Sequence, residues 1–308
     1  MHISVLLNES IDGLNIKEDG IYVDCTLGRG GHSCEILKRI KRGGYLFAFD
    51  QDKDAINTSK KRLEEIGNNF TIINSNFVNI KKELKDKSIS KVDGILFDLG
   101  VSSPQLDEDE RGFSFHHDAY LDMRMNQENK LSAHDVVNNY SEDELVNIFF
   151  KYGEEKYARS IAKAIVSSRK TKPIDTTLEL AEVIKSSVPI RVRREKHPAR
   201  KVFQAIRIEV NDELNVLEQA LNDSLDLLNV GGRIAVITFH SLEDRIVKNI
   251  FREVTEIDPK VKGLPVIPEE YRPSFGLVNN KVITPTEEEI TANPRARSSK
   301  LKKIKKIR

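Results

Sequence analysis

Asp24-Cys-Thr-Leu-Gly-Arg-Gly-Gly-His32 follows the short apolar run Ile21-Tyr-Val23 and precedes a polar stretch of helical character. Glycines at such a strand-to-helix turn let the backbone approach a ligand closely, because no Cβ stands in the way. The dinucleotide-binding pattern G-x-G-x-x-G requires a third glycine at the position that Ser33 occupies here. The stretch therefore predicts an α/β fold with a ligand loop after its first strand, but one that departs from the pyrophosphate-binding pattern.

Four short apolar runs alternate with helix-like stretches in the first third of the chain. Each run is too short for a helix and is typical of a strand buried on both faces: residues 21–23, 45–49, 70–73 and 92–97. Strands that alternate with helices indicate a right-handed parallel sheet. This alternation of strand-like and helix-like stretches stops after Pro104 and resumes at Gly232. We predict a Rossmann-like α/β domain, residues 1–105 and 206–308, interrupted by an all-helical insertion, residues 106–205.

The region between the two halves of the sheet has the pattern of helices only. Ser141-x-x-Glu144 and Thr176-x-x-Glu179 are typical of capping boxes that open two of them. The longest predicted helix carries an apolar stripe from Phe203 to Leu228 and ends at Gly231-Gly232.

The last fifty residues are less regular. Residues 257–299 hold six of the ten prolines, which predicts an irregular, partly extended segment. Val282-Ile283 and the apolar positions of Leu301–Ile307 are candidates for edge strands that close the sheet.

Two acids end later strands of the predicted sheet. Asp50 ends the second apolar run, where a carboxylate can accept hydrogen bonds from both hydroxyls of a ribose, and Asp98 ends the fourth. Ligands of open α/β sheets bind at the carboxyl ends of the strands, so we interpret both acids as ligand contacts. For Asp24 the sequence leaves function and helix capping equally open. Phe77, after the third run, is placed to pack on an adenine.

The loop and the acids together are typical of Rossmann-like proteins that bind S-adenosylmethionine. The pattern that remains is D-x-x-x-G-x-G, which holds an amino-acid carboxylate and ammonium rather than a pyrophosphate. Methyl transfer from a sulfonium needs no metal, and no His/Cys cluster with metal-ligand spacing surrounds Cys25 and Cys34. We therefore predict S-adenosylmethionine as the cofactor and no metal site.

Composition places the chain among soluble globular proteins. Apolar residues make up 39% and charged residues 31%, and no apolar run approaches the length of a membrane span. The first residues lack the basic flank and cleavage site of a signal peptide, and two cysteines cannot form a disulfide framework. We expect a cytoplasmic protein with reduced cysteines and no membrane contact.

Basic side chains are concentrated in two segments although the net charge is only +1. The first contributes the candidate contacts to the phosphates of a polyanionic partner, which are Arg191, Arg193, Arg194, Lys196, Arg200 and Lys201. The second is the tail Lys300–Arg308, with six basic residues and no acid. Its apolar Leu301, Ile304 and Ile307 predict that part of the tail packs on the core, so we expect fewer of its charges to meet that partner.

Six longer motifs resemble the RsmH/MraW family of 16S rRNA (cytosine-N4) methyltransferases. They occur in order over nearly the whole chain: Gly28-Arg-Gly-Gly-His-Ser33, Asp98-Leu-Gly-Val-Ser-Ser-Pro-Gln-Leu106, Glu110-Arg-Gly-Phe-Ser-Phe115, Leu121-Asp-Met-Arg-Met125, Phe239-His-Ser-Leu-Glu-Asp-Arg245 and Asn293-Pro-Arg-Ala-Arg-Ser-Ser299. The resemblance implies methylation of cytidine N4 in the decoding region of 16S rRNA, with the small ribosomal subunit as partner. It also implies cofactor contacts at Gly30, Gly31, His32, Asp50, Phe77, Asp98 and Gln105.

The acceptor of the amine proton is predicted as Asp98 or a main-chain carbonyl at Leu99-Gly100. The Asn/Asp/Ser-Pro-Pro-aromatic motif of many amino-methyltransferases is absent at this position, which leaves open how the amine is held. The roles of Phe239-His-Ser241 and Arg295-Ala-Arg297 also stay open. So do free RNA versus assembled subunit as substrate, and the oligomeric state, with a homodimer as one alternative.

Two other functions share part of this pattern. A nicotinamide-dependent oxidoreductase would use the same strand-turn-acid geometry, but Ser33 and the lack of a hydride-transfer constellation disfavour it. A non-enzymatic RNA-binding assembly factor would keep the basic segments and would not need Asp50 and Asp98.

Overall fold

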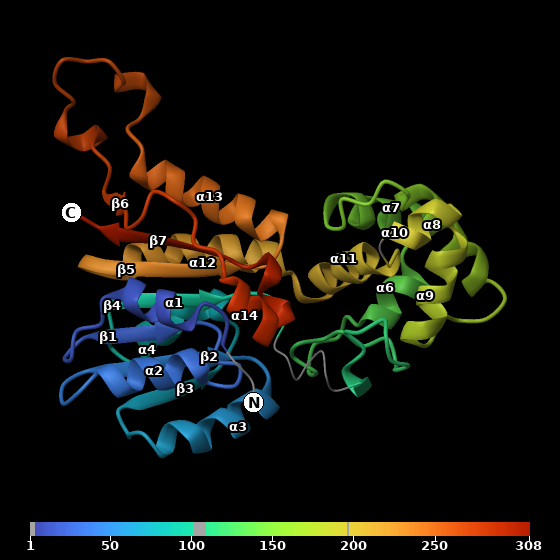
Figure 1. The fold of residues 1–308 in the computed structure, drawn as a ribbon, viewed down its shortest axis with the longest axis horizontal. Helices are drawn as coiled ribbons and strands as arrows, with labels where there is room; N and C mark the ends of the chain where they lie inside the picture. The colour runs from blue at the N-terminus through green and yellow to red at the C-terminus, as the bar shows by residue number, and fades with distance from the viewer. Residues whose placement is uncertain (1–3, 102–108, 196) are drawn as a thin grey trace. The chain divides into compact units, whose positions relative to one another are not determined.

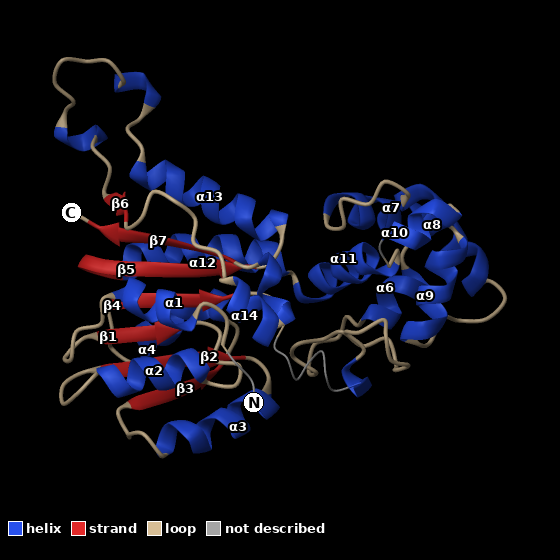
Figure 2. Ribbon diagram, in the orientation of Figure 1, coloured by secondary structure: helices blue, strands red, loops and turns tan. Residues whose placement is uncertain are grey.

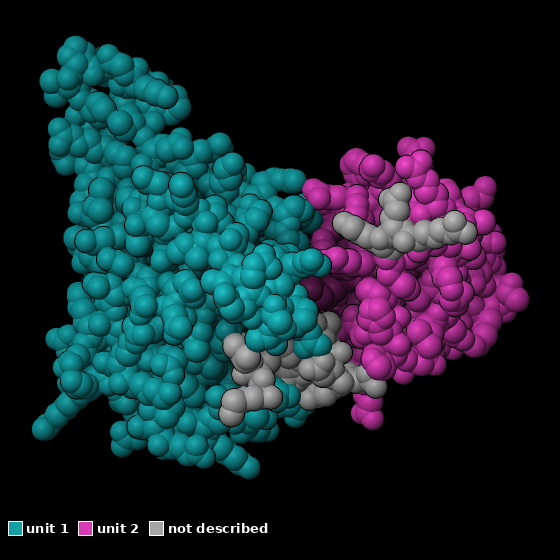
Figure 3. Space-filling model, viewed as in Figure 1, with its two compact units in different colours: residues 1–100, 214–308 teal, residues 101–213 magenta. Residues whose placement is uncertain are grey.

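The computed structural model describes residues 4–101, 109–195 and 197–308. The chain forms two compact units, residues 1–100 with 214–308 and residues 101–213 (Figure 3). The helical unit thus extends at both ends beyond the range 106–205 that the sequence predicts.

The first unit contains one seven-stranded sheet in the order β3-β2-β1-β4-β5-β7-β6 (Figures 1 and 2). The first five strands of that order, β3 to β5, run parallel to one another. Strand β7 is antiparallel to both of its neighbours, β5 and β6. The Rossmann-like α/β prediction is confirmed. The strands are β1 (Ile21–Asp24), β2 (Tyr45–Asp50), β3 (Phe70–Asn74), β4 (Val92–Asp98), β5 (Leu228–Thr238), β6 (Phe275–Leu277) and β7 (Lys300–Lys306).

Helices cover both faces of this sheet (Figure 2). Successive strand residues point to opposite faces, so Phe47 and Phe49 join one core while Leu46 and Ala48 join the other. The first core takes side chains from α4 (Ile80–Asp86), α12 (Glu213–Leu227) and α13 (Ser241–Thr255). The second takes them from α1 (Leu7–Leu14), α2 (Gly31–Arg39) and α3 (Lys53–Glu64). Burial on both faces explains why these strands are apolar without alternation.

The second unit has a core of its own, to which each of its longer helices contributes. The predicted capping boxes at Ser141 and Thr176 are confirmed, with Glu144 and Glu179 as their reciprocal partners. The helices are α6 (Ala133–Asn139), α7 (Glu142–Lys151), α8 (Ala158–Arg169), α9 (Thr177–Ser186), α10 (Ile190–Glu195) and α11 (Ala199–Asn211).

The single long helix predicted from Phe203 to Leu228 is wrong. Asp212 adopts a left-handed conformation, with φ 50° and ψ 37°, and separates α11 from α12. Asp is among the few residues that adopt this conformation readily, and the apolar spacing continues across the break without revealing it. Leu228 already belongs to β5, so Gly231-Gly232 lie inside a strand rather than at a helix end.

The closing strands also differ from the prediction. The segment Leu301–Ile307 does supply β7, but β7 lies inside the sheet, and the outer edge is β6, which the sequence did not indicate. Ile283 forms only an isolated bridge with Leu301. Across the described ranges, no helix combines the length and the apolar character needed to cross a membrane.

Candidate active site

Three aspartates end three neighbouring strands of the sheet. Asp24 is the last residue of β1, Asp50 of β2 and Asp98 of β4, and β1 lies between the other two strands. Because these strands are parallel, their carboxyl ends meet at one edge of the sheet. We call it the carboxylate edge. Open α/β sheets bind their ligands at this edge.

Asp50 holds the glycine loop in place. Its Oδ2 accepts a hydrogen bond from the Gly28 N–H at 2.9 Å, and its Oδ1 accepts one from the Asp52 N–H at 2.9 Å. Burial raises the pKa of Asp50 to about 6, and the negative charges of Asp52 and Asp24 act in the same direction. Each carboxylate oxygen has a second acceptor position, so Asp50 can still accept hydrogen bonds from a ligand.

Asp24, whose role the sequence left open, is engaged inside the protein. Its carboxylate is fully buried, with Oδ2 accepting from the Ser33 hydroxyl at 2.7 Å and Oδ1 from the Thr26 N–H at 3.0 Å. Ser33, which stands where a dinucleotide site has glycine, is therefore a hydrogen-bond donor to Asp24. This geometry favours a bracing role for Asp24 within the loop.

Asp98 lies beside His32 from the first turn of α2. The His32 Nδ1 is 3.6 Å from Asp98 Oδ2, and its Nε2 is 3.1 Å from the Val5 carbonyl oxygen. A carbonyl oxygen only accepts, so Nε2 carries the proton of this bond. The Asp98 N–H donates to the Thr26 hydroxyl at 2.7 Å, which ties β4 to the loop after β1.

One oxygen of Asp98 has no hydrogen-bond partner in the described part of the chain. This Oδ1 is screened from solvent by its surroundings. Burial raises the pKa of Asp98 well above its ordinary value, and the charges of Asp24 and Glu243 raise it further. An unsatisfied buried acceptor costs free energy, which a donor on a bound ligand would offset. The carboxylate edge therefore fits a ligand that brings such a donor.

The glycine loop has a backbone that other residues adopt only with strain. Gly28 has φ 49° and Gly30 has φ 76°, both in the left-handed region. At Gly31 a Cβ would lie 1.8 Å from the Ser4 hydroxyl oxygen. The loop thus combines a left-handed backbone with close packing, as expected for a segment that presents its amides to a ligand.

Phe77 and Gln105 complete the predicted cofactor contacts. Phe77 opens the short helix η1 (Phe77–Asn79) and packs edge-to-face on Phe97, with ring centroids 5.6 Å apart and planes at 89°. Its ring is only partly buried in this core. Gln105 lies outside the described residues.

Sequence reasoning missed two residues of the carboxylate edge. Glu243, on the first turn of α13, is 3% exposed and accepts hydrogen bonds from the N–H groups of Phe239 and His240. His240-x-x-Glu243 forms a capping box directly after β5, but His is not among the usual N-cap residues, so capping rules do not find it. Thr26, which joins Asp24 to Asp98, carries no comparable signal.

Comparison with known proteins decides the family. The profile of the MraW methylase family matches residues 1–307. The chain belongs to that family. Ribosomal RNA small subunit methyltransferase H of Streptococcus mutans serotype c is 55% identical to it over 310 residues, covering 100% of this chain and 98% of that one.

Solved structures include similar chains at low sequence identity. An rRNA methylase from Streptococcus thermophilus is 14% identical, covers 100% of both chains and has a TM-score of 0.46. A protein from Streptococcus mutans in complex with SAH is 14% identical, covers 99% of both chains and has a TM-score of 0.44.

Membership of the MraW methylase family makes the chain an S-adenosylmethionine-dependent methyltransferase, as predicted. It decides against the nicotinamide-dependent oxidoreductase and against the assembly factor without activity. In this MraW methylase Ser33 replaces the third glycine of the dinucleotide pattern and braces the loop through its hydrogen bond to Asp24.

Two side chains of the first basic segment of this MraW methylase bind carbonyl oxygens of the helical unit. Arg193 donates to the carbonyl of Ser186, the last residue of α9, at 3.2 Å, and to that of Val188, just beyond the helix, at 3.1 Å. Lys201 Nζ donates to the Glu154 carbonyl at 2.7 Å. Arg191 and Arg200 are exposed, nothing is described for the Arg194 side chain, and Lys196 lies outside the described residues.

The basic tail is largely engaged within the fold. Lys302 contacts Asp244, Lys303 Nζ donates to the Glu9 carbonyl at 3.3 Å, and Lys306 Nζ to the Leu228 carbonyl at 3.1 Å. Burial lowers the pKa of both Lys303 and Lys306. These contacts agree with the expectation that the tail packs on the core.

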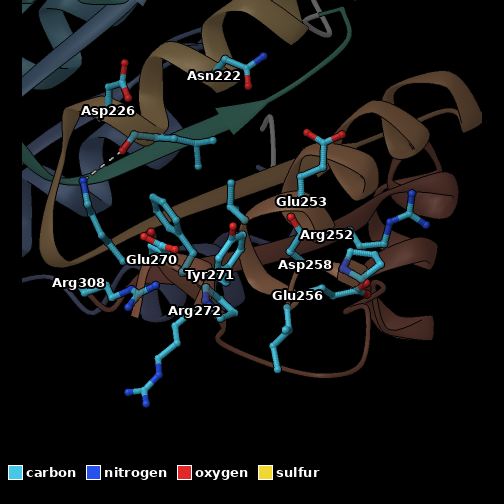
Figure 4. Close-up of a pocket in the computed structure, with 18 of the residues that line it drawn as sticks. Asn222, Asp226, Arg252, Glu253, Glu256, Asp258, Glu270, Tyr271, Arg272 and Arg308 are labelled. Carbon is cyan, nitrogen blue, oxygen red and sulfur yellow. Dashed lines mark hydrogen bonds between the residues drawn. The ribbon is translucent and has the colours of Figure 1, made fainter. Parts of the chain in front are cut away.

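A cavity of about 1010 Å³ lies elsewhere in the first unit (Figure 4). Side chains of α12 and α13, such as Asn222 and Arg252, line it together with Tyr271 and Arg308. Arg308 ends the tail after β7, and β7 is antiparallel to β5, so the cavity lies at the amino ends of the parallel strands. It is therefore separate from the carboxylate edge.

Proposed function

We propose that the chain transfers a methyl group from S-adenosylmethionine to N4 of one cytidine in the decoding region of 16S rRNA. Its relative at 55% identity is named for the RNA of the small ribosomal subunit. The observation that carries the proposal is the unpaired, buried Oδ1 of Asp98 at the carboxylate edge. The experiment that tests it is identification of the methylated nucleoside in 16S rRNA by mass spectrometry.

The cofactor contacts follow the geometry of the loop and the strand ends. Asp50 would accept the ribose hydroxyls, since it can accept more hydrogen bonds than Gly28 and Asp52 supply. Gly30, Gly31 and His32 would lie against the amino-acid part, at the start of α2. The partly buried ring of Phe77 would pack on the adenine, and Gln105 would complete the set.

Asp98 is the residue we propose for holding and deprotonating the amine. When bound, S-adenosylmethionine supplies the methyl group on a sulfonium, so the protein has mainly to align the amine. The lone pair of cytosine N4 is delocalised into the ring, and an acceptor for its N–H localises it. A raised pKa makes Asp98 a stronger proton acceptor than an ordinary aspartate. The His32 Nδ1, 3.6 Å away, faces the same carboxylate.

The RNA has to present its base to this edge. A cytosine within a helix cannot reach the cofactor, so we infer that the target base is unstacked before transfer. The RNA of the small ribosomal subunit is the partner we propose, and the cytoplasm is the compartment where that RNA is met.

We expect the exposed arginines of the first basic segment to contribute more to RNA affinity than the tail. Arg191→Ala with Arg200→Ala removes two exposed charges, and each lost phosphate contact to single-stranded RNA reduces the steepness of log affinity against log salt by roughly 0.7. Lys305→Ala with Arg308→Ala is the matched control, because it removes the same number of charges from the tail, where Arg308 pairs with Glu269. Filter binding to a 16S rRNA transcript over a salt series measures both slopes.

Affinity for S-adenosylmethionine should be the same in both variants, since neither touches the carboxylate edge. Equal losses of RNA affinity in the two pairs, or a larger loss in the tail pair, would show that the RNA surface has been placed wrongly.

A further inference from the structure

The short helix η5 (Pro294–Ser298) carries two exposed arginines, Arg295 and Arg297, on either side of Ala296. It joins α14 (Glu287–Ala292) to β7 (Figure 1). Ala296 is 0% exposed and packs in the same core as Leu6 and Leu301, whereas Arg295 and Arg297 are exposed. Burial of the residue between them fixes the turn, so both guanidinium groups stay on the surface.

The strand register places η5 at the carboxylate edge. Lys300, two residues after η5, pairs with Thr238, the last residue of β5. The neighbouring Ile237 pairs with Asp98 at the end of β4. The Ser299 N–H donates to the Ala296 carbonyl at 2.8 Å, which anchors the turn directly to this end of β7. Arg295 and Arg297 therefore belong to the edge at which methyl transfer is proposed.

Two acids near η5 have partners of their own within the first unit. The structure gives Arg297 no acceptor in the ranges it describes. Asp244, the acid beside the start of β7, faces two ammonium groups, those of Lys300 at 3.7 Å and Lys302. On α14, the Glu289 carboxylate accepts from the Leu6 N–H at 2.6 Å. These two carboxylates therefore have partners other than Arg297, and Glu287 and Glu288 of α14 are exposed.

We propose that Arg295 and Arg297 bind phosphates of the RNA next to the target nucleotide. The inference rests on the proposed function and adds a second RNA-contacting surface, in the first unit, to the basic segment of the helical unit. A guanidinium matches the geometry of a phosphate with two parallel hydrogen bonds, and it keeps its charge at any working pH. A nucleotide delivered to the carboxylate edge brings its own flanking phosphates to that edge, where these arginines stand.

The test is filter binding of a 16S rRNA transcript that contains the decoding region, over a salt series. Arg295→Ala with Arg297→Ala should lower the salt slope by about 1.4, since each contact to single-stranded RNA contributes roughly 0.7, and weaken binding roughly tenfold at 0.1 M salt. Arg295→Lys with Arg297→Lys should keep most of the slope. Lys305→Ala with Arg308→Ala, at the opposite edge of the sheet, should behave as wild type.

Calorimetry with S-adenosylmethionine provides the check on folding, and its dissociation constant should be unchanged in all variants. A wild-type slope in the alanine pair overturns this inference while leaving the proposed function intact. Wild-type protein that binds the transcript without any salt dependence overturns both.

Discussion

Replacing Asp98 by asparagine is expected to lower the single-turnover rate of methyl transfer by about 10²–10⁴-fold, the usual contribution of a positioned proton acceptor. The amide cannot take the proton of the amine. The melting temperature should change little. The pKa of Asp98 is raised in the folded protein, so its ionised carboxylate destabilises the fold and its loss costs no stability. The protonated carboxyl stabilises the fold at low pH, and this contribution is lost as pH rises. At neutral pH the asparagine variant therefore has no such contribution to lose.

Asp93→Asn is the matched control, since Asp93 lies near the start of the same strand. Its carboxylate accepts from the Ile21 N–H at 3.1 Å and pairs with Lys17 at 3.3 Å, far from the carboxylate edge. We expect this variant to lose some stability and to keep the wild-type rate. A near-wild-type rate in Asp98→Asn would transfer the role to the other acceptor, a main-chain carbonyl at Leu99-Gly100.

Asp50→Ala is expected to weaken binding of S-adenosylmethionine by about 100-fold with the fold retained. Hydrogen bonds to a charged group contribute roughly 1.5–3 kcal/mol each, and the variant also frees the Gly28 N–H that the carboxylate holds at 2.9 Å. Isothermal calorimetry gives the dissociation constant, and circular dichroism monitors the fold. Asp54→Ala, an exposed acid in the first turn of α3, is the control and should bind as wild type.

The same carboxylate predicts the direction of a pH dependence. With a pKa of about 6, Asp50 loses its charge as pH falls through 6, so affinity for the cofactor should fall between pH 7 and pH 5. Stability moves the other way. Because the pKa is raised above 3.8, the contribution of Asp50 to folding grows as pH falls toward that value. Titration of Asp50 therefore does not weaken binding at pH 5 through unfolding. In Asp50→Ala the part of the pH dependence of affinity that comes from Asp50 should be absent. An unchanged dissociation constant in Asp50→Ala would remove Asp50 from the site.

The carboxylate edge could be predicted because parallel strands impose its position. Once residues 21–23, 45–49 and 92–97 are assigned as strands, their final acids must share an edge, and Asp24, Asp50 and Asp98 do so. The sequence does not indicate which of these acids already has hydrogen-bond partners within the protein. Only the structure reveals that Ser33 and Thr26 donate to Asp24, whereas one oxygen of Asp98 stays without a partner.

Other features escaped prediction for reasons of context. The break at Asp212 leaves the three- and four-residue spacing of apolar positions intact, so periodicity predicts one helix where the structure has two. The three-residue strand β6 is too short to show alternation. Basic residues are the hardest to assign, since charge alone does not separate Arg193, which binds carbonyls at the end of α9, from exposed Arg200.

The most direct measurement is mass spectrometry of nucleosides and fragments of 16S rRNA from cells that lack this protein. We predict that N4-methylation is lost at a single cytidine in the decoding region. Purified wild-type protein with S-adenosylmethionine should restore it on that RNA, and Asp98→Asn should not. Unchanged methylation of 16S rRNA in the deletion strain, or a methyl group restored to an atom other than cytidine N4, would contradict the proposed function.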